Sequence, residues 1–100
     1  MTPEPSGQAA GAITRVMKIV NEKGLHARAS AKFVQTVEKF DAEVTVERSG
    51  EKAGGNSIMG LMMLAAGIGT SITVSATGPQ AAEVMDALTA LVSSRFGEEE

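Results

Sequence analysis

Residues 42–56 read AEVTVERSGEKAGGN, and this stretch contains the clearest structural signal in the chain. Over its first seven positions apolar and polar side chains alternate, with Val44 and Val46 on the apolar side, which is the period of a half-buried β-strand. The dipeptide Ser49-Gly50 is typical of a hairpin turn, so residues 51–56 are expected to return as a second strand. Paired glycines weaken that return strand, and we therefore expect it at an edge of the sheet.

The segments on both sides of this hairpin alternate between strands and helices. A β-branched run predicts a strand at 13–20, and apolar residues at helical spacing predict a helix over 27–40. Beyond the hairpin we expect a short helix from residue 57, a strand at 71–76, and a helix that opens at Gly78-Pro79 with proline at its first position. This order, β-α-β-β-α-β-α, predicts an α+β fold of two layers, with a four-stranded, mainly antiparallel sheet and helices on one face.

Length and composition indicate one small globular domain. The 100 residues have a formal net charge of −3, no cysteine, and three phenylalanines as the only aromatic residues. The negative balance gives no electrostatic reason to expect a nucleic acid partner, and the lack of cysteine excludes disulfides, thiolate zinc sites and cysteine nucleophiles. We expect residues 1–12 to form a disordered tail, residues 13–97 to form the domain, and the acidic residues 98–100 to fray.

The sequence favours a soluble, cytoplasmic protein. Its first twelve residues lack the basic and apolar regions of a secretion signal. The longest strongly apolar run, residues 58–68, contains two glycines and is too short to span a bilayer. We therefore expect no membrane insertion.

The segment GLHARASA, residues 24–31, contains the only histidine. His26 falls where a loop ends and a helix begins, and a helix start offers unpaired backbone N–H groups and the positive end of the dipole. Arg28 follows with a fork of donors that suits phosphate oxygens. Because imidazole is a nucleophile near neutral pH, this segment could carry a phosphoryl group. The alternative is a surface histidine that only begins a helix, and a lone histidine gives less support to a metal site or a catalytic triad.

A second segment, NSIMGLMML at residues 56–64, is apolar after its first two positions. Ser57 is suited to cap the helix, and it is also a position where a phosphate would be tolerated by the helix start. If Ile58, Leu61 and Leu64 face the core, at least two of the methionines must face outward. Methionine is common at adaptable binding surfaces, so the alternatives are an exposed docking patch and methionines that fill gaps in a core poor in aromatics.

Together the two segments resemble HPr, the histidine-containing phosphocarrier family of the bacterial phosphoenolpyruvate-dependent phosphotransferase system. The motifs are GLHAR at 24–28 and NSIMGLMML about thirty residues later, and the similarity extends from about residue 16 to residue 96. The resemblance implies an open-faced β-sandwich with strand order 1-4-2-3. It also implies that His26 receives a phosphoryl group on Nδ1 from enzyme I, which is charged from phosphoenolpyruvate, and passes it to a IIA domain.

The resemblance also assigns roles to other residues. Arg28 would be the active-site arginine, and Ser57 would match the serine that HPr kinase/phosphorylase modifies. The residues expected to bind protein partners are Lys32, Ile58, Met59 and Met62. We expect no cofactor, no metal and no nucleic acid, and we expect a monomer.

The chain departs from the family at one position of the histidine motif. Many members have proline directly after the active-site arginine, where this chain has Ala29. Proline in a first helical turn pre-sets φ, so alanine is expected to loosen the helix entry by about 0.4–1 kcal/mol through chain entropy. We expect no effect on the chemistry.

Three functions remain open from the sequence. The first is the phosphocarrier, whether it serves sugar uptake or a nitrogen-linked regulatory branch. The second is a regulatory HPr-like protein of the nitrogen-related branch that acts by protein binding and not in sugar uptake. The third is a small-molecule-binding α/β sandwich of the ACT type, but this would need a ligand site between subunits, for which the sequence contains no signal.

Overall fold

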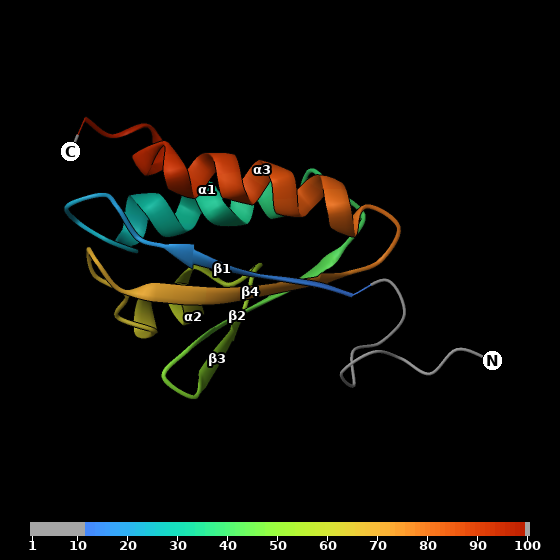
Figure 1. The fold of residues 1–100 in the computed structure, drawn as a ribbon, viewed down its shortest axis with the longest axis horizontal. Coiled ribbons are helices and arrows are strands. Elements are labelled where there is room, and N and C mark those ends of the chain that lie inside the picture. The colour runs from blue at the N-terminus through green and yellow to red at the C-terminus, as the bar shows by residue number, and fades with distance from the viewer. Residues whose placement is uncertain (1–11, 100) are drawn as a thin grey trace.

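The computed structural model describes residues 12–99, which form a four-stranded sheet with helices packed against it (Figure 1). The elements follow in the order β1 (Ile13–Lys18), α1 (Ala27–Val37), β2 (Glu43–Arg48), β3 (Glu51–Gly54), α2 (Ile58–Met63), β4 (Ser71–Thr77) and α3 (Ala81–Ser93), and a 3₁₀ turn at Arg95–Gly97 comes last. The predicted order of strands and helices is confirmed. Of the expected tail at 1–12, only residue 12 lies within the described residues.

The sheet is antiparallel throughout, with the spatial order β1-β4-β2-β3. This order is the one that the resemblance implied, and β3 lies at an edge as the paired glycines predicted. The hairpin turns at Ser49 and Gly50, whose φ angles of 53° and 83° suit the twist of a tight β-hairpin. Gly55 follows β3 at a close approach, since a Cβ there would lie 2.7 Å from Cγ1 of Val44.

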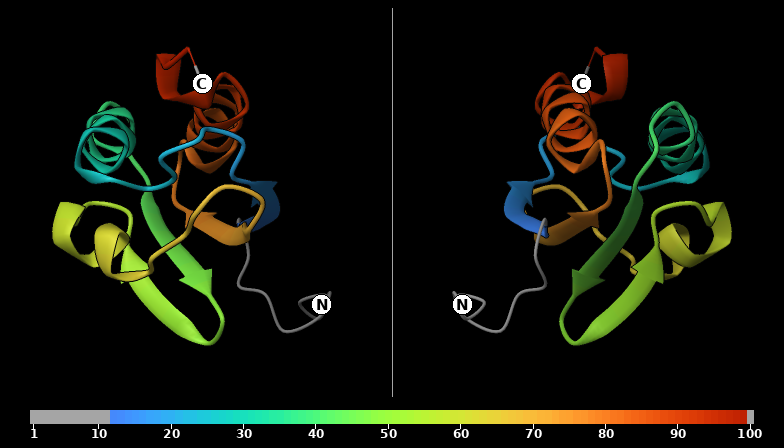
Figure 2. Two further views of the ribbon diagram at one scale, coloured as in Figure 1. Left: turned by 90° about the vertical axis from the view of Figure 1, so that its left-hand side faces the viewer. Right: turned by 90° about the vertical axis from the view of Figure 1, so that its right-hand side faces the viewer.

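The helices lie on one face of the sheet (Figure 2). Helix α3 packs on β1 and β4, α1 packs between α3 and α2, and α2 also contacts β3. Alternation along the strands matches this layering, because Val46 and Val74 are fully buried under the helices while Thr45 is exposed on the open face. The α+β fold with an open-faced sheet is thus confirmed.

Burial shows which side of β1 faces the helices. Met17 is 5% exposed and Ile19 is fully buried just beyond the strand, whereas Val16 is 69% exposed. The odd-numbered side therefore faces the helices. The strand ends at Lys18, two residues before the predicted end, and α1 ends at Val37, three residues before its predicted end.

The expected start of α3 at Gly78-Pro79 is wrong by two residues. Gln80 is the N-cap, because its carbonyl oxygen accepts the first helical hydrogen bond from the Val84 N–H at 2.9 Å. Gly78 has a φ of 112° and belongs to the preceding turn, so Pro79 lies before the cap. Gln80 also exchanges two hydrogen bonds with the backbone of Asp41, which fixes the helix start to the connection between α1 and β2.

Two of the three apolar residues that could form the core face of α2 are buried. Leu61 and Leu64 are buried, but Ile58 is 41% exposed. Two steps of three residues rotate a helix by about 120° in total, so Ile58 and Leu64 cannot both face the core across so short a helix. Ile58 therefore joins the exposed methionines.

Within residues 12–99, none of the helices is both long enough and apolar enough to cross a bilayer.

Candidate functional site

His26 is the N-cap residue of α1, as its sequence position predicted. Its backbone is extended, and its carbonyl oxygen accepts the N–H of Ser30 at 2.8 Å, which is the first hydrogen bond of the helix. The side chain of His26 caps none of the N–H groups of the first turn. Since those N–H groups have no partner within the helix, they are available to an anion bound at this helix start.

The loop before His26 is fixed by close contacts with the connection between α2 and β4. The Leu25 N–H donates to the Ala66 carbonyl oxygen at 2.9 Å, and the buried Ser30 hydroxyl donates back to the Leu25 carbonyl oxygen at 3.2 Å. Gly24 has a φ of 67°, and a Cβ there would lie 2.4 Å from the Ala66 oxygen. The motif GLHAR thus needs its glycine for this approach, which holds the imidazole at the helix start.

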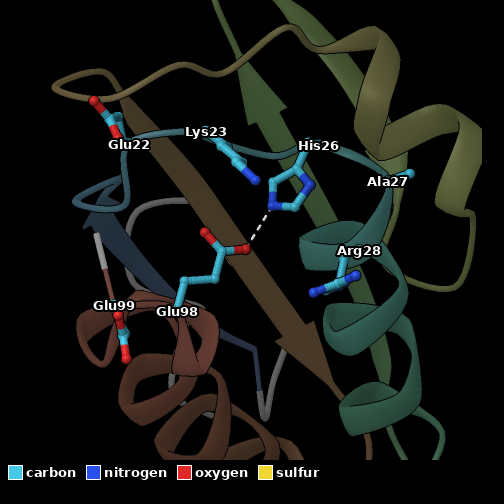
Figure 3. A pocket seen from close by; sticks show the side chains of 7 residues that line it. All are labelled: Glu22, Lys23, His26, Ala27, Arg28, Glu98 and Glu99. Atoms are coloured by element: carbon cyan, nitrogen blue, oxygen red, sulfur yellow. Dashed lines mark hydrogen bonds and ion pairs between the residues drawn. The ribbon is translucent and has the colours of Figure 1, made fainter.

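The pocket beside the imidazole is lined by the two basic residues Lys23 and Arg28, the carboxylates of Glu22, Glu98 and Glu99, and Ala27 (Figure 3). Arg28 is exposed, as expected for a residue that meets an external ligand. The Lys23 and Arg28 side chains reach into the space around His26 (Figure 3). They offer two cationic groups to an anion at the helix start.

Glu98 contacts the imidazole directly. Its Oε2 lies 2.5 Å from Nε2 of His26, and the two side chains are only 16% and 28% exposed. Its other oxygen, Oε1, accepts a hydrogen bond from Nδ2 of Asn21 at 3.1 Å. Asn21 is fully buried and also donates to the Gly24 carbonyl oxygen at 2.9 Å, so the carboxylate is fixed to the same loop that holds His26.

The environment of Glu98 favours its ionised form. Burial acts to raise the pKa of this carboxyl, but hydrogen bonds from His26 and Asn21 and the charges of His26 and Lys23 outweigh burial and lower its pKa below the ordinary 4.5. A carboxylate has no hydrogen to donate, so Nε2 of His26 supplies the hydrogen in their contact. Among residues 12–99 no hydrogen bond reaches Nδ1, and this nitrogen is the one left for an external group.

A reversal of the chain after α3 brings Glu98 to this position. Residues 98–100, at the acidic end of the chain, were expected to fray. Instead Arg95, Phe96 and Gly97 have φ angles of 61°, 56° and 77°, and Phe96 is fully buried. Lys32 donates from Nζ to the Phe96 carbonyl oxygen at 2.6 Å. Burial of this aromatic ring turns the chain back over α1 and brings Glu98 to His26.

Ser57 is the N-cap of α2, and its Oγ accepts the Gly60 N–H at 3.0 Å. Next to it lies the α2 patch, which consists of Ile58, Met59, Met62 and Met63, exposed by 41%, 70%, 40% and 72%. The patch is close to the histidine, because α2 packs against α1 and the connection after α2 binds the Gly24–Leu25 loop. The structure thus brings the two sequence motifs to one side of the molecule.

The family is identified by a comparison with known protein families. The model for the "PTS HPr component phosphorylation site" matches residues 13–94. The chain belongs to the HPr family. It is 50% identical over 88 residues to Phosphocarrier protein HPr of Cupriavidus necator, across 88% of this chain and 99% of the relative. The crystal structure of HPr-C-His from Thermoanaerobacter tengcongensis superposes with a TM-score of 0.84 at 41% identity, over 88% of this chain and 99% of that one.

Membership of the HPr family makes this chain a phosphocarrier of the phosphotransferase system, as the two motifs predicted. The alternative of a binding-only regulator in a nitrogen-related branch is not favoured. Phosphocarrier protein NPr of Shewanella violacea is 41% identical over 86 residues, which span 86% of this chain and 94% of the relative, and its name also describes a phosphocarrier. No cluster of three or more metal-ligating side chains occurs in the described part of this HPr-family chain.

Three residues of the site were not predicted from the sequence. Asn21 and Lys23 lie in the loop before the motif, for which the sequence indicated no site residue. Glu98 is more than seventy positions from His26 in the sequence. The only signal that could have indicated a folded chain end was Phe96, a single aromatic residue that follows polar residues and precedes a glycine. Lys32 was expected to bind partners. In the structure one of its N–H donors is used by the reversed chain end.

Proposed function

We propose that His26 accepts the phosphoryl group on Nδ1 from phosphorylated enzyme I and passes it to a IIA component. The observation that supports this most strongly is that the two imidazole nitrogens have different environments. Nε2 is held by the Glu98 carboxylate, while Nδ1 is free of protein partners within residues 12–99, at a helix start with unpaired N–H groups. The lone pair of Nδ1 attacks phosphorus, the bond from phosphorus to the donor breaks, and the donor keeps that electron pair.

Arg28 assists this transfer electrostatically. Its guanidinium is exposed beside His26, and the charge on the moving phosphoryl oxygens is spread over positions that a planar fork of donors can contact. Lys23 adds a second positive charge on the loop side of the pocket. Both groups are free to meet the phosphoryl group during transfer, because neither is buried in the fold.

The α2 patch binds the protein partners, and Ser57 regulates that binding. The patch with Ile58, Met59 and Met62, together with Lys32, forms the surface on which enzyme I and the IIA component dock. A phosphate placed on Ser57 by an HPr kinase/phosphorylase adds a charge of about −1.5 to −2 at the rim of this apolar surface. A partner that buries the patch must then desolvate that charge or oppose it with its own, which weakens docking. On the basis of the family we expect the carrier to act in the cytoplasm as a monomer.

The test is phosphorylation of the purified chain by enzyme I and phosphoenolpyruvate. We expect acid-labile, base-stable phosphate on the wild type and none on a His26→Ala variant. The substitution leaves the backbone cap of α1 intact, because the His26 side chain makes no cap hydrogen bond. Undiminished labelling of the His26→Ala variant would contradict the assignment.

A further inference from the structure

The Glu98 contact with His26 is built into the fold and does not depend on a loose chain end. Glu98 is held on one oxygen by Asn21, which is fully buried, and on the other by His26. The three residues that precede Glu98 adopt left-handed φ angles: Arg95, Phe96 and Gly97. Non-glycine residues reach such angles only at a cost in free energy. The buried Phe96 ring and the Lys32 hydrogen bond maintain this turn. The carboxylate position is therefore fixed by the core.

The geometry points to Glu98 as a positioning residue for phosphoryl transfer: it orients the His26 ring through Nε2 and stabilises the positive charge that the ring gains when Nδ1 is phosphorylated. This inference rests on the proposed role of His26 as the acceptor. Asn21 supports Glu98 by binding its second oxygen. None of these three side chains needs to move for the transfer.

The proton and charge balance shows why a carboxylate at Nε2 matters. The form of the imidazole that attacks phosphorus has its hydrogen on Nε2 and a lone pair on Nδ1. When Nδ1 forms its bond to phosphorus and the donor leaves with its electron pair, the Nε2 hydrogen stays in place and the ring becomes a cation. Glu98 then forms an ion pair with that cation. Onward transfer breaks the Nδ1–phosphorus bond, returns the electron pair to Nδ1 and restores the neutral ring.

The phosphoryl group and Glu98 act on different sides of the ring. The phosphoryl oxygens meet the helix start and Arg28, whereas the carboxylate meets Nε2 on the side of the chain reversal, where the Lys23 amine also lies (Figure 3). A positioned carboxylate that pairs with an imidazole as it becomes cationic is an effective way to stabilise charge in a partly buried site. Glu98 should therefore favour both the transition state and the phosphorylated carrier.

The experiment compares wild type, Glu98→Gln and Glu98→Ala, with Glu83→Gln as the charge-matched control. Glu83 is exposed in the first turn of α3, at the opposite end of that helix from the site. We measure the equilibrium constant for phosphoryl exchange with enzyme I and the kcat and KM of uptake. Because an equilibrium constant does not depend on how the partners dock, it isolates stabilisation of the phosphorylated ring.

We expect the Glu98→Gln and Glu98→Ala variants to shift the exchange equilibrium toward enzyme I by about tenfold, which is the lower range for a charge-assisted hydrogen bond. The kcat should fall by a similar factor at an unchanged KM, and the Glu83→Gln variant should match the wild type. The proton NMR signal of the bound Nε2–H should be visible in the wild type and absent from the Glu98→Ala variant. Circular dichroism checks that each variant is folded.

An equilibrium constant of the Glu98→Gln variant equal to that of the wild type would overturn the inference. This result is distinct from failure of the proposed function, which would appear as labelling of the His26→Ala variant. If the Glu98→Ala variant fails to fold, the Glu98→Gln variant still decides the question, because it keeps the side-chain shape and removes only the charge.

Discussion

The starts of α1 and α2 differ in what satisfies their first N–H groups. At α2 the Ser57 hydroxyl accepts the Gly60 N–H, so the protein closes its own helix end. At α1 the His26 side chain turns away to Glu98 and caps nothing. The comparison indicates that one helix start is left open for an external anion, while the other is complete until its capping residue is modified.

The largest expected effect is a slower phosphoryl transfer when Arg28, at the open start of α1, is replaced. An Arg28→Ala variant should transfer phosphoryl groups about a hundredfold more slowly, because a donor to the charge of the transition state is lost. The free energy of unfolding should change by less than about 0.5 kcal/mol, since the side chain is exposed. Stopped-flow transfer kinetics and urea denaturation measure the two quantities.

The control for Arg28 is Lys39→Ala, which removes an equal charge from an exposed position just beyond the far end of α1. It should leave transfer unchanged. An Arg28→Lys variant should fall between wild type and alanine, because it keeps the charge without the planar fork. Wild-type kinetics in the Arg28→Ala variant would remove this residue from the mechanism.

The closed start is tested next, by adding charge at Ser57. A Ser57→Asp variant, and the enzymatically phosphorylated protein, should take up phosphoryl groups about tenfold less efficiently, which corresponds to about 1.4 kcal/mol of lost docking energy. The KM should rise while kcat is retained, since the charge lies beside the α2 patch and not at the imidazole. Steady-state uptake from enzyme I provides both constants.

A Ser49→Asp variant places the same charge on the exposed turn between β2 and β3 and should behave as the wild type. Thermal unfolding of all forms separates weaker docking from loss of folding. Equal uptake by the wild type and the Ser57-modified forms would show that Ser57 is only a cap.

A smaller effect on stability compares the two starts directly. Removal of the α2 cap in a Ser57→Ala variant should lower the free energy of unfolding by about 1 kcal/mol. At α1 a side-chain cap can be added instead of removed. A His26→Asn variant should be about 1 kcal/mol more stable than His26→Ala, because asparagine supplies the side-chain cap that this start lacks. Both His26 variants lose the Glu98 contact, so their difference isolates the cap. Equal stability of these two variants in chemical denaturation would argue that the α1 start is not open.

The smallest expected effect is a pH-dependent contribution of Glu98 to stability at the α1 start, which is lost at low pH. Folding lowers the pKa of Glu98 below 4.5, so the unfolded chain binds this proton more tightly than the folded protein. The carboxylate therefore stabilises the fold fully above about pH 4.5, and this contribution disappears as the pH falls through the lowered folded pKa. The difference in unfolding free energy between the wild type and the Glu98→Gln variant should follow that course. A difference that is independent of pH would contradict it.

The sequence predicted what depends on local pattern. The alternation around Val44 and Val46, the Ser49-Gly50 turn and the position of His26 at a helix start all follow from side-chain period and turn chemistry within a few residues. These local features determine the order of the elements, and the family resemblance supplied the strand order.

The remaining features depend on contacts between distant segments. Glu98 reaches His26 only because Phe96 is buried and three successive left-handed residues reverse the chain, and such a reversal has no periodic signature. The sequence left open which side of α2 Ile58 occupies, and its exposure depends on how this short helix packs against α1 and β3. The start of α3 moved to Gln80 because Asp41, from another part of the chain, supplies its hydrogen-bond partners.

The central claim is that the nitrogen left free at the open helix start is the one that carries the phosphoryl group. The most direct measurement is the coupling between ³¹P and ¹⁵N in protein labelled at histidine and phosphorylated by enzyme I and phosphoenolpyruvate. With a single histidine in the chain, each ring nitrogen is observed without ambiguity. The account predicts that phosphorus couples directly to Nδ1 of His26 while Nε2 keeps its hydrogen. Direct coupling to Nε2, which would require Glu98 to leave its place, would contradict it.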